Sequence, residues 1–227
     1  MTGSEPPEGM RELYPFLYSG ESEIEAVLAE VGRSTAEKAN EIVALRQEVA
    51  ERSGVLLAEC AEAMAKRFAM GGRLFTFGNG GSSTDAQEVA EAFSYPPRGR
   101  SLPALCLTND VAVLTALSND VSFEVTFARQ LAALGGTGDI ALGLSTSGGS
   151  PNVVRAIEEA ARRGMLTIAL AGYQGGELAE LAALDYLFVI PSSSVHRIQE
   201  AQTTVYHVLC ELTQIALGAL SSQETTT

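Results

Sequence analysis

The chain has few cysteines and far fewer basic than acidic residues, and each of these two shortages excludes a class of protein. Cys60, Cys106 and Cys210 form no CxxC pair, so we expect them to be reduced core residues and not a redox centre. The 15 basic residues against 28 acidic ones give a net charge of −13. A field of this sign opposes direct binding to nucleic acids and to anionic membrane surfaces.

Two further absences concern location and cofactors. No apolar run approaches the roughly 20 residues that cross a bilayer, and no basic-then-apolar leader opens the sequence. We therefore expect a cytoplasmic protein without a membrane partner. The chain also lacks the GxGxxG spacing and the Walker lysine, so we expect no nucleotide cofactor.

Two loops rich in glycine and serine each follow an apolar strand and precede a helix. The first loop is Gly78-Asn79-Gly80-Gly81-Ser82, and the second loop is Ser145-Thr146-Ser147-Gly148-Gly149-Ser150. Glycines allow a close approach to an anion, hydroxyls donate to it, and helix N-termini add partial positive charge. Pro151 after a hydroxyl N-cap at Ser150 is typical of a helix start. Tight packing alone also explains one such turn, but the repeated pattern favours phosphate binding.

Apolar strands alternate with helical patterns over most of the chain, which predicts a parallel sheet covered on both faces. Helical spacing in 22–51 and 55–70 predicts two helices before the first strand. The expected strands are 73–77, 103–107, 139–144, 166–170 and 185–190. The other expected helices are 82–94, helices within 111–134, 151–163, 177–183 and 196–220. In such sheets ligands bind beyond the carboxyl ends of the strands, where both loops lie.

The expected domain organisation is simple. Residues 1–21 are rich in Pro, Gly and Glu, and we expect them to form a flexible N-terminal arm. Residues 22–227 have the length and apolar content of a single α/β domain that includes the two N-terminal helices.

Five motifs carry a resemblance to a known family. They are GNGGSSTDA (78–86), LSND (117–120), GDIALGLSTSGGSPNVVRAI (138–157), AGYQGGELAEL (171–181) and HRIQEAQTTVYH (196–207). With them the chain resembles the sugar isomerase (SIS) domain family, especially the phosphoheptose isomerases and their relative, the DnaA initiator-associating protein. The resemblance implies a three-layer α/β/α sandwich with a central parallel sheet, preceded by N-terminal helices. It also implies a homotetramer with sites at subunit interfaces.

The resemblance further implies an activity and its residues. Phosphoheptose isomerases convert sedoheptulose 7-phosphate to an aldoheptose 7-phosphate through an enediol, without a nucleotide and often with zinc. The implied substrate-binding residues are Asn79, Gly80, Ser82, Asp120, Ser145, Thr146, Ser147, Ser150, His196 and Gln199. The catalytic positions depart from the family. Where the family has a His, this chain has Glu88, and where the family has a Glu four residues later, this chain has Ala92. The family's C-terminal histidine is retained as His207.

Glu88 and His207 are the candidate catalytic residues, and each also has a simpler interpretation. Enediol chemistry needs a base at the carbon atoms, and Glu88 shares a helix face with the position of the missing Glu. A solvated helix face explains Glu88 equally well, and it explains Glu91 better than a catalytic role does. His207 lies among apolar residues, as structural histidines do, yet its eight-residue spacing from Gln199 puts both on nearly one face.

The candidate zinc ligands are Glu88, Gln199 and His207, a poor set because catalytic zinc takes His, Cys, Asp or Glu. Two functions remain open. One is an isomerase of a phosphorylated sugar that uses His207 and Glu88. The other is a non-catalytic sugar-phosphate-binding module that regulates or bridges partners. The missing Glu favours the module, whereas His207 and the intact second loop favour the isomerase.

Overall fold

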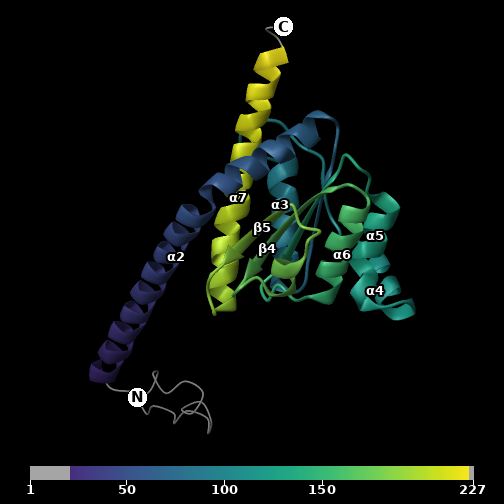
Figure 1. The fold of residues 1–227 in the computed structure, drawn as a ribbon. Coiled ribbons are helices and arrows are strands. Elements are labelled where there is room, and N and C mark those ends of the chain that lie inside the picture. The colour runs from purple at the N-terminus through teal and green to yellow at the C-terminus, as the bar shows by residue number, and fades with distance from the viewer. Residues whose placement is uncertain (1–20, 225–227) are drawn as a thin grey trace, which may run out of the picture. The chain divides into compact units, whose positions relative to one another are not determined.

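The computed structural model describes residues 21–224 of the chain, which divides into two compact units, Met1–Ala44 and Leu45–Thr227. Helix α2, Glu21–Ala69, begins in the first unit and continues into the second (Figure 1). The other described elements all belong to the second unit. Apart from Glu21, the predicted N-terminal arm 1–21 lies outside the described residues.

Helix α2 is continuous, so the prediction of two helices over 22–51 and 55–70 is wrong. One buried face runs through the expected break, formed within the second unit by Leu45, Val49, Ser53, Leu57, Cys60, Ala61, Met64, Ala65 and Phe68. Gly54 has open space around it. A glycine inside a helix costs only about 1 kcal/mol relative to alanine, which the packing of this face outweighs.

The centre of the second unit is a five-stranded parallel sheet with the order β2-β1-β3-β4-β5. Its strands are β1 Leu74–Gly78, β2 Ala104–Cys106, β3 Ile140–Ser145, β4 Leu166–Gly172 and β5 Tyr186–Ile190. All residues of β1, β3 and β4 are buried, as a sheet covered on both faces requires. The five predicted strands are thereby confirmed, and β1 and β3 are neighbours.

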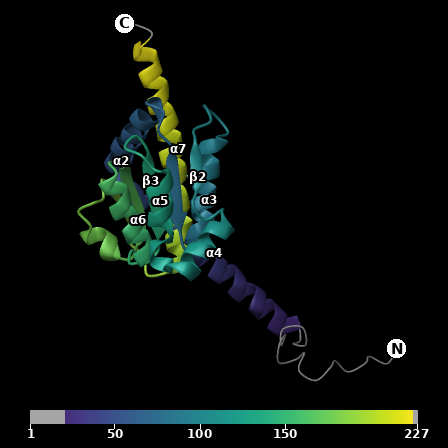
Figure 2. The ribbon, with the colours of Figure 1, turned by 90° about the vertical axis from the view of Figure 1, so that its right-hand side faces the viewer.

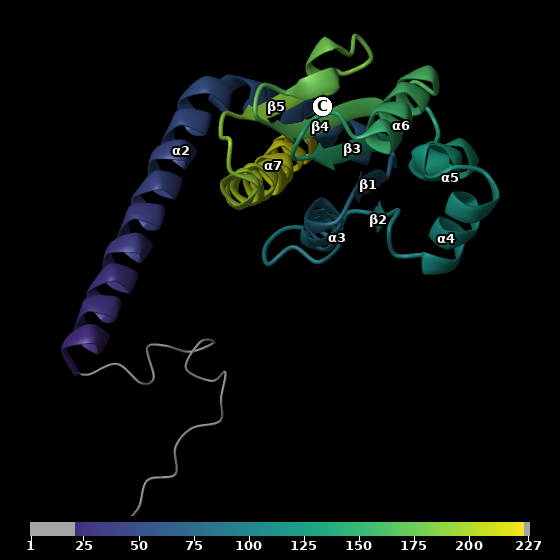
Figure 3. The same cartoon turned by 90° about the horizontal axis from the view of Figure 1, so that it is seen from below.

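Helices form a layer on each face of the sheet, which confirms the predicted three-layer sandwich (Figures 2 and 3). One layer contains α3, Gly81–Ser94, and α7, Val195–Glu224. The opposite layer contains α5, Thr126–Leu134, and α6, Pro151–Arg162, with the short helix α4, Val111–Asp120, beside them. The 3-10 helices are η2, Phe123–Val125, and η3, Gly176–Glu180.

An apolar core fills the space between the sheet and the layer of α5 and α6. Its largest members are Phe75, Phe77, Phe127, Leu131 and Ile157. The rings of Phe77 and Phe127 lie 5.5 Å apart, which joins β1 to α5. Cys60, Cys106 and Cys210 are buried free thiols, as expected. Within residues 21–224 no helix has the length and apolarity that a membrane crossing needs.

A buried carboxylate ties β1 to β3 at their amino ends. Asp139 accepts hydrogen bonds from the Arg73 main chain at 2.8 Å, the Arg73 guanidinium at 2.9 Å and the Gly136 N–H at 2.9 Å. Burial raises the pKa of Asp139, but these hydrogen bonds outweigh it and the net pKa is lowered. The anchor lies at the end of the sheet opposite the two loops.

Candidate functional site

The two predicted phosphate loops lie side by side, because each follows one of two paired strands. Gly78 at the end of β1 is in register with Leu144 near the end of β3. The side-chain amides of Asn79 and Asn152 exchange two hydrogen bonds of 2.8 Å. Asn152 is only 1% exposed, so water does not compete for this link. The first loop is thereby joined to the first turn of α6, which the second loop precedes.

The hydroxyls of the second loop form a connected set. The Ser145 hydroxyl lies 3.0 Å from that of Ser150 and accepts from the Gly148 N–H at 3.1 Å. The Ser147 hydroxyl accepts from the Gly149 N–H at 3.2 Å. Ser150 is the N-cap residue of α6 as predicted, but its side chain caps no N–H of the helix. The first turn of α6 therefore presents the positive end of the helix without a side-chain cap.

Two glycines allow close approaches that shape the site. Gly148 has a φ of 69°, and a β-carbon there would lie 1.9 Å from the Gly175 carbonyl oxygen. Only glycine therefore lets the loop after β4 pack on the second loop. A β-carbon at Gly81 would lie 2.3 Å from Nε2 of Gln199. Gly81 thus lets the side chain of Gln199, on α7, contact the first loop.

Helices α3 and α7 bring Glu88 and His207 together. Nε2 of His207 lies 3.0 Å from Oε1 of Glu88, and the Tyr206 hydroxyl donates to Oε2 of Glu88 at 2.7 Å. A carboxylate can only accept, so Nε2–H of His207 is the donor, and in an imidazole that carries this one ring proton Nδ1 is an acceptor. The Glu88 and His207 side chains are 49% and 46% exposed, so a ligand has access to both.

A second pair of side chains links the same helices one turn closer to the first loop. Nε2 of Gln199 donates to Oδ2 of Asp85 at 3.1 Å. Burial raises the pKa of the Asp85 carboxyl, the hydrogen bond from Gln199 opposes this, and the charge of Glu88 raises it further. Asp85 and Glu88 are three residues apart, which places them on one face of α3.

The sequence analysis missed Asp85, Asn152 and Tyr206 as site residues. Helical spacing carried a signal for Asp85, because it stands three residues before Glu88 within the GNGGSSTDA motif. Tyr206 precedes His207 directly, but in the sequence it is only one of the apolar neighbours of that histidine, because nothing there shows where its hydroxyl lies. Asn152 had no local signal, because its partner lies 73 residues away.

The position of the family's glutamate offers no reactive group here. The Cys210 thiol donates to the Ala92 carbonyl oxygen at 3.4 Å. Burial is the main reason that the pKa of Cys210 is raised to about 11, so the thiol stays protonated. Glu88 is therefore the carboxylate that α3 supplies to His207.

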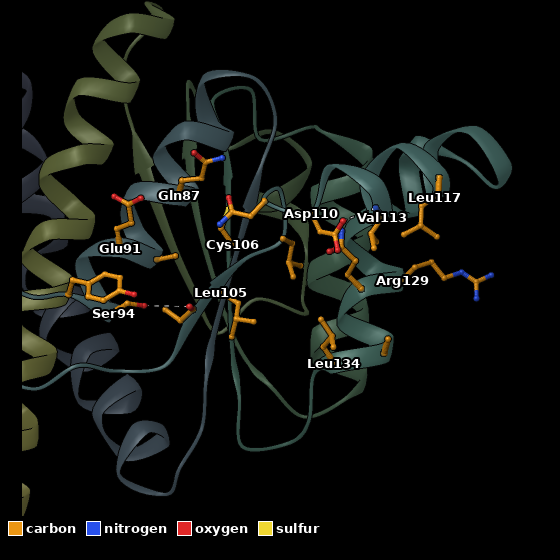
Figure 4. A pocket seen from close by; sticks show the side chains of 18 residues that line it. Gln87, Glu91, Ser94, Leu105, Cys106, Asp110, Val113, Leu117, Arg129 and Leu134 are labelled. Carbon is orange, nitrogen blue, oxygen red and sulfur yellow. Dashed lines mark hydrogen bonds between the residues drawn. The ribbon is translucent and has the colours of Figure 1, made fainter.

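The other side of α3 borders a groove of about 1060 Å³ next to the edge strand β2 (Figure 4). Glu91 and Gln87 line it from α3, Leu105 lines it from β2, and Val113 and Arg129 line it from α4 and α5. None of the predicted substrate-binding or catalytic residues is among the described residues that line it. Glu91 thus belongs to the groove and not to the face of α3 that carries Glu88.

Two predicted residues lie on helices and not in the loops. Asp120 ends α4, where its carboxylate accepts from the Asn119 amide at 2.7 Å. His196 is exposed near the start of α7. Over residues 21–224 no hydrogen bond or ion pair joins either side chain to the loops. The Ser82 side chain lies at the first turn of α3 and is buried.

The side chains of Glu88, Gln199 and His207 do not form one metal-binding set. The Gln199 amide is bound to Asp85, while His207 Nε2 is bound to Glu88. The part of the chain that the structure describes contains no cluster of three His, Cys, Asp or Glu able to hold a metal ion. Catalytic zinc sites use three protein ligands, so these residues do not fit a resident zinc ion.

Comparisons with known proteins agree with the geometry. The SIS domain family matches residues 39–172. The phosphoheptose isomerase of Thermodesulfovibrio yellowstonii is 43% identical over 176 residues, 77% of this chain and 87% of that protein. That of Aquifex aeolicus is 46% identical over 146 residues, 63% of this chain and 75% of that protein. The solved phosphoheptose isomerase of Neisseria gonorrhoeae has a TM-score of 0.74 at 34% identity, covering 80% of this chain and 97% of its own.

Proposed function

Because the chain belongs to the SIS domain family, in its phosphoheptose isomerase branch, we propose that it is an aldose-ketose isomerase acting on sedoheptulose 7-phosphate. The observation that carries the proposal is the pair of Glu88 and His207, 3.0 Å apart and accessible, on two helices that meet at the first loop. Isomerisation moves a proton between adjacent carbons through an enediol, which requires such an acid-base group.

The two loops bind the phosphate in this proposal. The implied residues Asn79, Gly80, Ser82, Ser145, Thr146, Ser147 and Ser150 include no lysine or arginine. The negative charge is met by hydroxyls, by N–H groups and by the N-termini of α3 and α6. This fits a protein of net charge −13, which captures a phosphate by local geometry.

The spacing of the site supports a long sugar. Glu88 stands seven residues after Gly81, which corresponds to about 10 Å along the helix at 1.5 Å per residue. A seven-carbon sugar phosphate has its carbonyl carbon many bonds from the phosphate and can span this separation. A three-carbon sugar phosphate cannot.

We assign the proton transfer to His207. With its Nε2–H donated to Glu88, the imidazole presents Nδ1 as the base that takes the proton from carbon. The carboxylate of Glu88 stabilises the imidazolium that forms, and His207 then returns the proton to the adjacent carbon of the enediol. The hydroxyl that becomes the new carbonyl passes its own proton to the former carbonyl oxygen, so the ketose and the aldose have the same composition. Gln199, held by Asp85 against Gly81, is placed to hydrogen-bond sugar hydroxyls. No step of this mechanism passes through zinc or a nucleotide.

The test is turnover of sedoheptulose 7-phosphate by the purified full chain, with EDTA and with added zinc. We expect turnover in EDTA, because the donor set does not fit zinc. We expect His207→Ala to lower kcat by roughly 10²- to 10⁴-fold while the sugar phosphate still binds. Binding without turnover of any six- or seven-carbon sugar phosphate by the wild type would refute the isomerase.

Ala92 favours a second candidate function. It leaves the position of the family's glutamate without a carboxylate, and its neighbour Cys210 is a protonated thiol. A sugar-phosphate-binding module that regulates or bridges partners needs the two loops but not this carboxylate. The turnover assay separates this candidate from the isomerase.

We also propose a cytoplasmic homotetramer with sites at subunit interfaces. Ile24, Leu28 and Val31, at i, i+4 and i+7 of the 21–44 segment of α2, are 40%, 64% and 55% exposed. Such a stripe is typical of a helix that packs on another subunit. Light scattering tests this, and a stable monomer at micromolar concentration contradicts it.

A further inference from the structure

We propose that Tyr206 is the positioning residue of the site, and that its hydroxyl holds the Glu88 carboxylate and thereby the tautomer of His207. This inference rests on the proposed isomerase function. Tyr206 touches no reacting atom in the mechanism above. It acts through Glu88.

The hydrogen bonds divide the carboxylate between two donors. The Tyr206 hydroxyl donates to Oε2 of Glu88 at 2.7 Å, and His207 bonds Oε1 at 3.0 Å. A carboxylate held at one oxygen can rotate about its last bond, whereas two donors on different oxygens fix its plane. The Tyr206 ring also lies 5.0 Å from the imidazole of His207, which restricts the tilt of that ring.

Tyr206 is a suitable anchor because it is immobile. Its side chain is fully buried, while those of Glu88 and His207 are about half exposed. Its hydroxyl also lies 3.3 Å from Oγ1 of Thr203, whose own proton is donated to the Gln199 carbonyl at 3.0 Å. Oγ1 of Thr203 can therefore only accept from the Tyr206 hydroxyl, and the carboxylate of Glu88, at 2.7 Å, is the closer and stronger of the two acceptors for that proton. A buried donor holds its partner more strongly than a solvated one.

No other group in the described part of the chain takes this role. Among residues 21–224 the hydrogen-bond partners of the Glu88 side chain are Tyr206 and His207. Ala92, one turn further along α3, offers only a methyl group. The zinc ion that would otherwise hold a carboxylate and an imidazole together does not fit these ligands. Loss of the Tyr206 hydroxyl therefore leaves Glu88 with a single partner.

The kinetic test compares Tyr206→Phe with Tyr186→Phe in the full chain. Tyr186 is the matched control, because its hydroxyl bonds the Glu59 carbonyl oxygen at 3.4 Å, away from the site. We expect Tyr206→Phe to lower kcat about tenfold with KM changed less than twofold, and Tyr186→Phe to change neither. Tyr206→4-aminophenylalanine keeps the ring and a donor, so it should restore most of kcat and also preserve the packing.

An NMR measurement tests the same proposal without turnover. The chain has two histidines, so His196 serves as an internal reference for the ring nitrogens of His207. We expect wild-type His207 to carry its proton on Nε2, and Tyr206→Phe to shift it toward a mixture of tautomers. If the wild type shows no turnover, the proposed function fails while this measurement still decides the role of Tyr206.

Three results would overturn the proposal. In one, the His207 signals of Tyr206→Phe match those of the wild type. Even if kcat falls in that variant, the loss of kcat then does not act through the pair of Glu88 and His207. Another is a kcat of Tyr206→Phe within twofold of the wild type. The third is a 4-aminophenylalanine variant that folds, as shown by thermal unfolding, but resembles Tyr206→Phe in its kcat and in its His207 spectrum.

Discussion

Replacing Glu88 by glutamine is the most direct perturbation of the proposed mechanism. The substitution keeps the shape of the side chain but turns one acceptor oxygen into an NH2 donor. In the structure Oε2 faces the Tyr206 hydroxyl and Oε1 faces His207 Nε2, so the new NH2 meets one of two donors. Either the hydroxyl turns to accept, or His207 adopts the tautomer with its proton on Nδ1.

The cost in stability is small. Either rearrangement restores both hydrogen bonds. The Glu88 side chain is 49% exposed, so water screens the remaining electrostatic effect of losing its charge. A typical hydrogen bond contributes about 1 kcal/mol, and we expect the free energy of unfolding to change by less than about 1 kcal/mol. We expect the melting temperature of Glu88→Gln to stay close to that of the wild type.

The cost in activity is much larger. In either rearrangement, loss of the Glu88 charge removes the group that stabilises the imidazolium, and in the second one the proton on Nδ1 of His207 also removes the base. We expect kcat to fall by roughly 10²- to 10³-fold, which corresponds to about 3–4 kcal/mol in the activation free energy. The change in the activation free energy is therefore several times larger than the change in the free energy of unfolding.

The assay measures kcat and KM with sedoheptulose 7-phosphate, its affinity by calorimetry, and the melting temperature. The matched control is Glu91→Gln, because Glu91 lines the groove beside β2 and not the face that meets α7. We expect the control to behave as the wild type does. A kcat of Glu88→Gln within threefold of the wild type would refute the assignment of Glu88, and a loss of binding instead of kcat would make it a substrate ligand.

Three further predictions concern the loops, the anchor of the sheet and the thiols. Ser147→Ala and Ser150→Ala each remove a donor to a charged acceptor, a hydrogen bond that contributes about 1.5–3 kcal/mol. Calorimetry should therefore show a roughly tenfold or greater loss of sugar-phosphate affinity in each variant. Unchanged affinity in both variants would exclude the second loop from the phosphate site. Asp139→Asn should lower the free energy of unfolding at pH 7 by about 2 kcal/mol, measured with urea. The pKa of Asp139 is lowered in the folded state, so its contribution to the free energy of unfolding is fully present above the unfolded pKa of about 3.9. That contribution disappears as the pH falls through the folded pKa. The difference in the free energy of unfolding between Asp139→Asn and the wild type should therefore shrink toward pH 2. Cys210, with its pKa raised to about 11, should resist iodoacetamide at pH 8 until the protein unfolds, and rapid labelling of the native chain contradicts its burial.

Local chemistry made much of the fold predictable. Alternating apolar strands and helices predicted the parallel sheet, and the glycine-serine turns predicted where its ligand edge lies, because both signals are contained in short contiguous segments. Pro151 after Ser150 marked the start of α6 for the same reason. The predicted break in α2 was wrong, because residues on both sides of Gly54 bury one continuous face. The cost of one glycine is local, whereas the packing that overrides it is not.

The sequence by itself determined the strands, the helices that follow the first strand, the two loops and the departure from the family at Glu88 and Ala92. Only the tertiary structure decided that Glu88 meets Tyr206 and His207, 118 and 119 residues away. It also decided that Asn79 pairs with Asn152 across neighbouring strands. Such contacts depend on strand order and on the rotation of two helices about their axes, to within the few tenths of an ångström that a hydrogen bond allows. Propensity and spacing act along the chain and carry no information at that precision between distant segments.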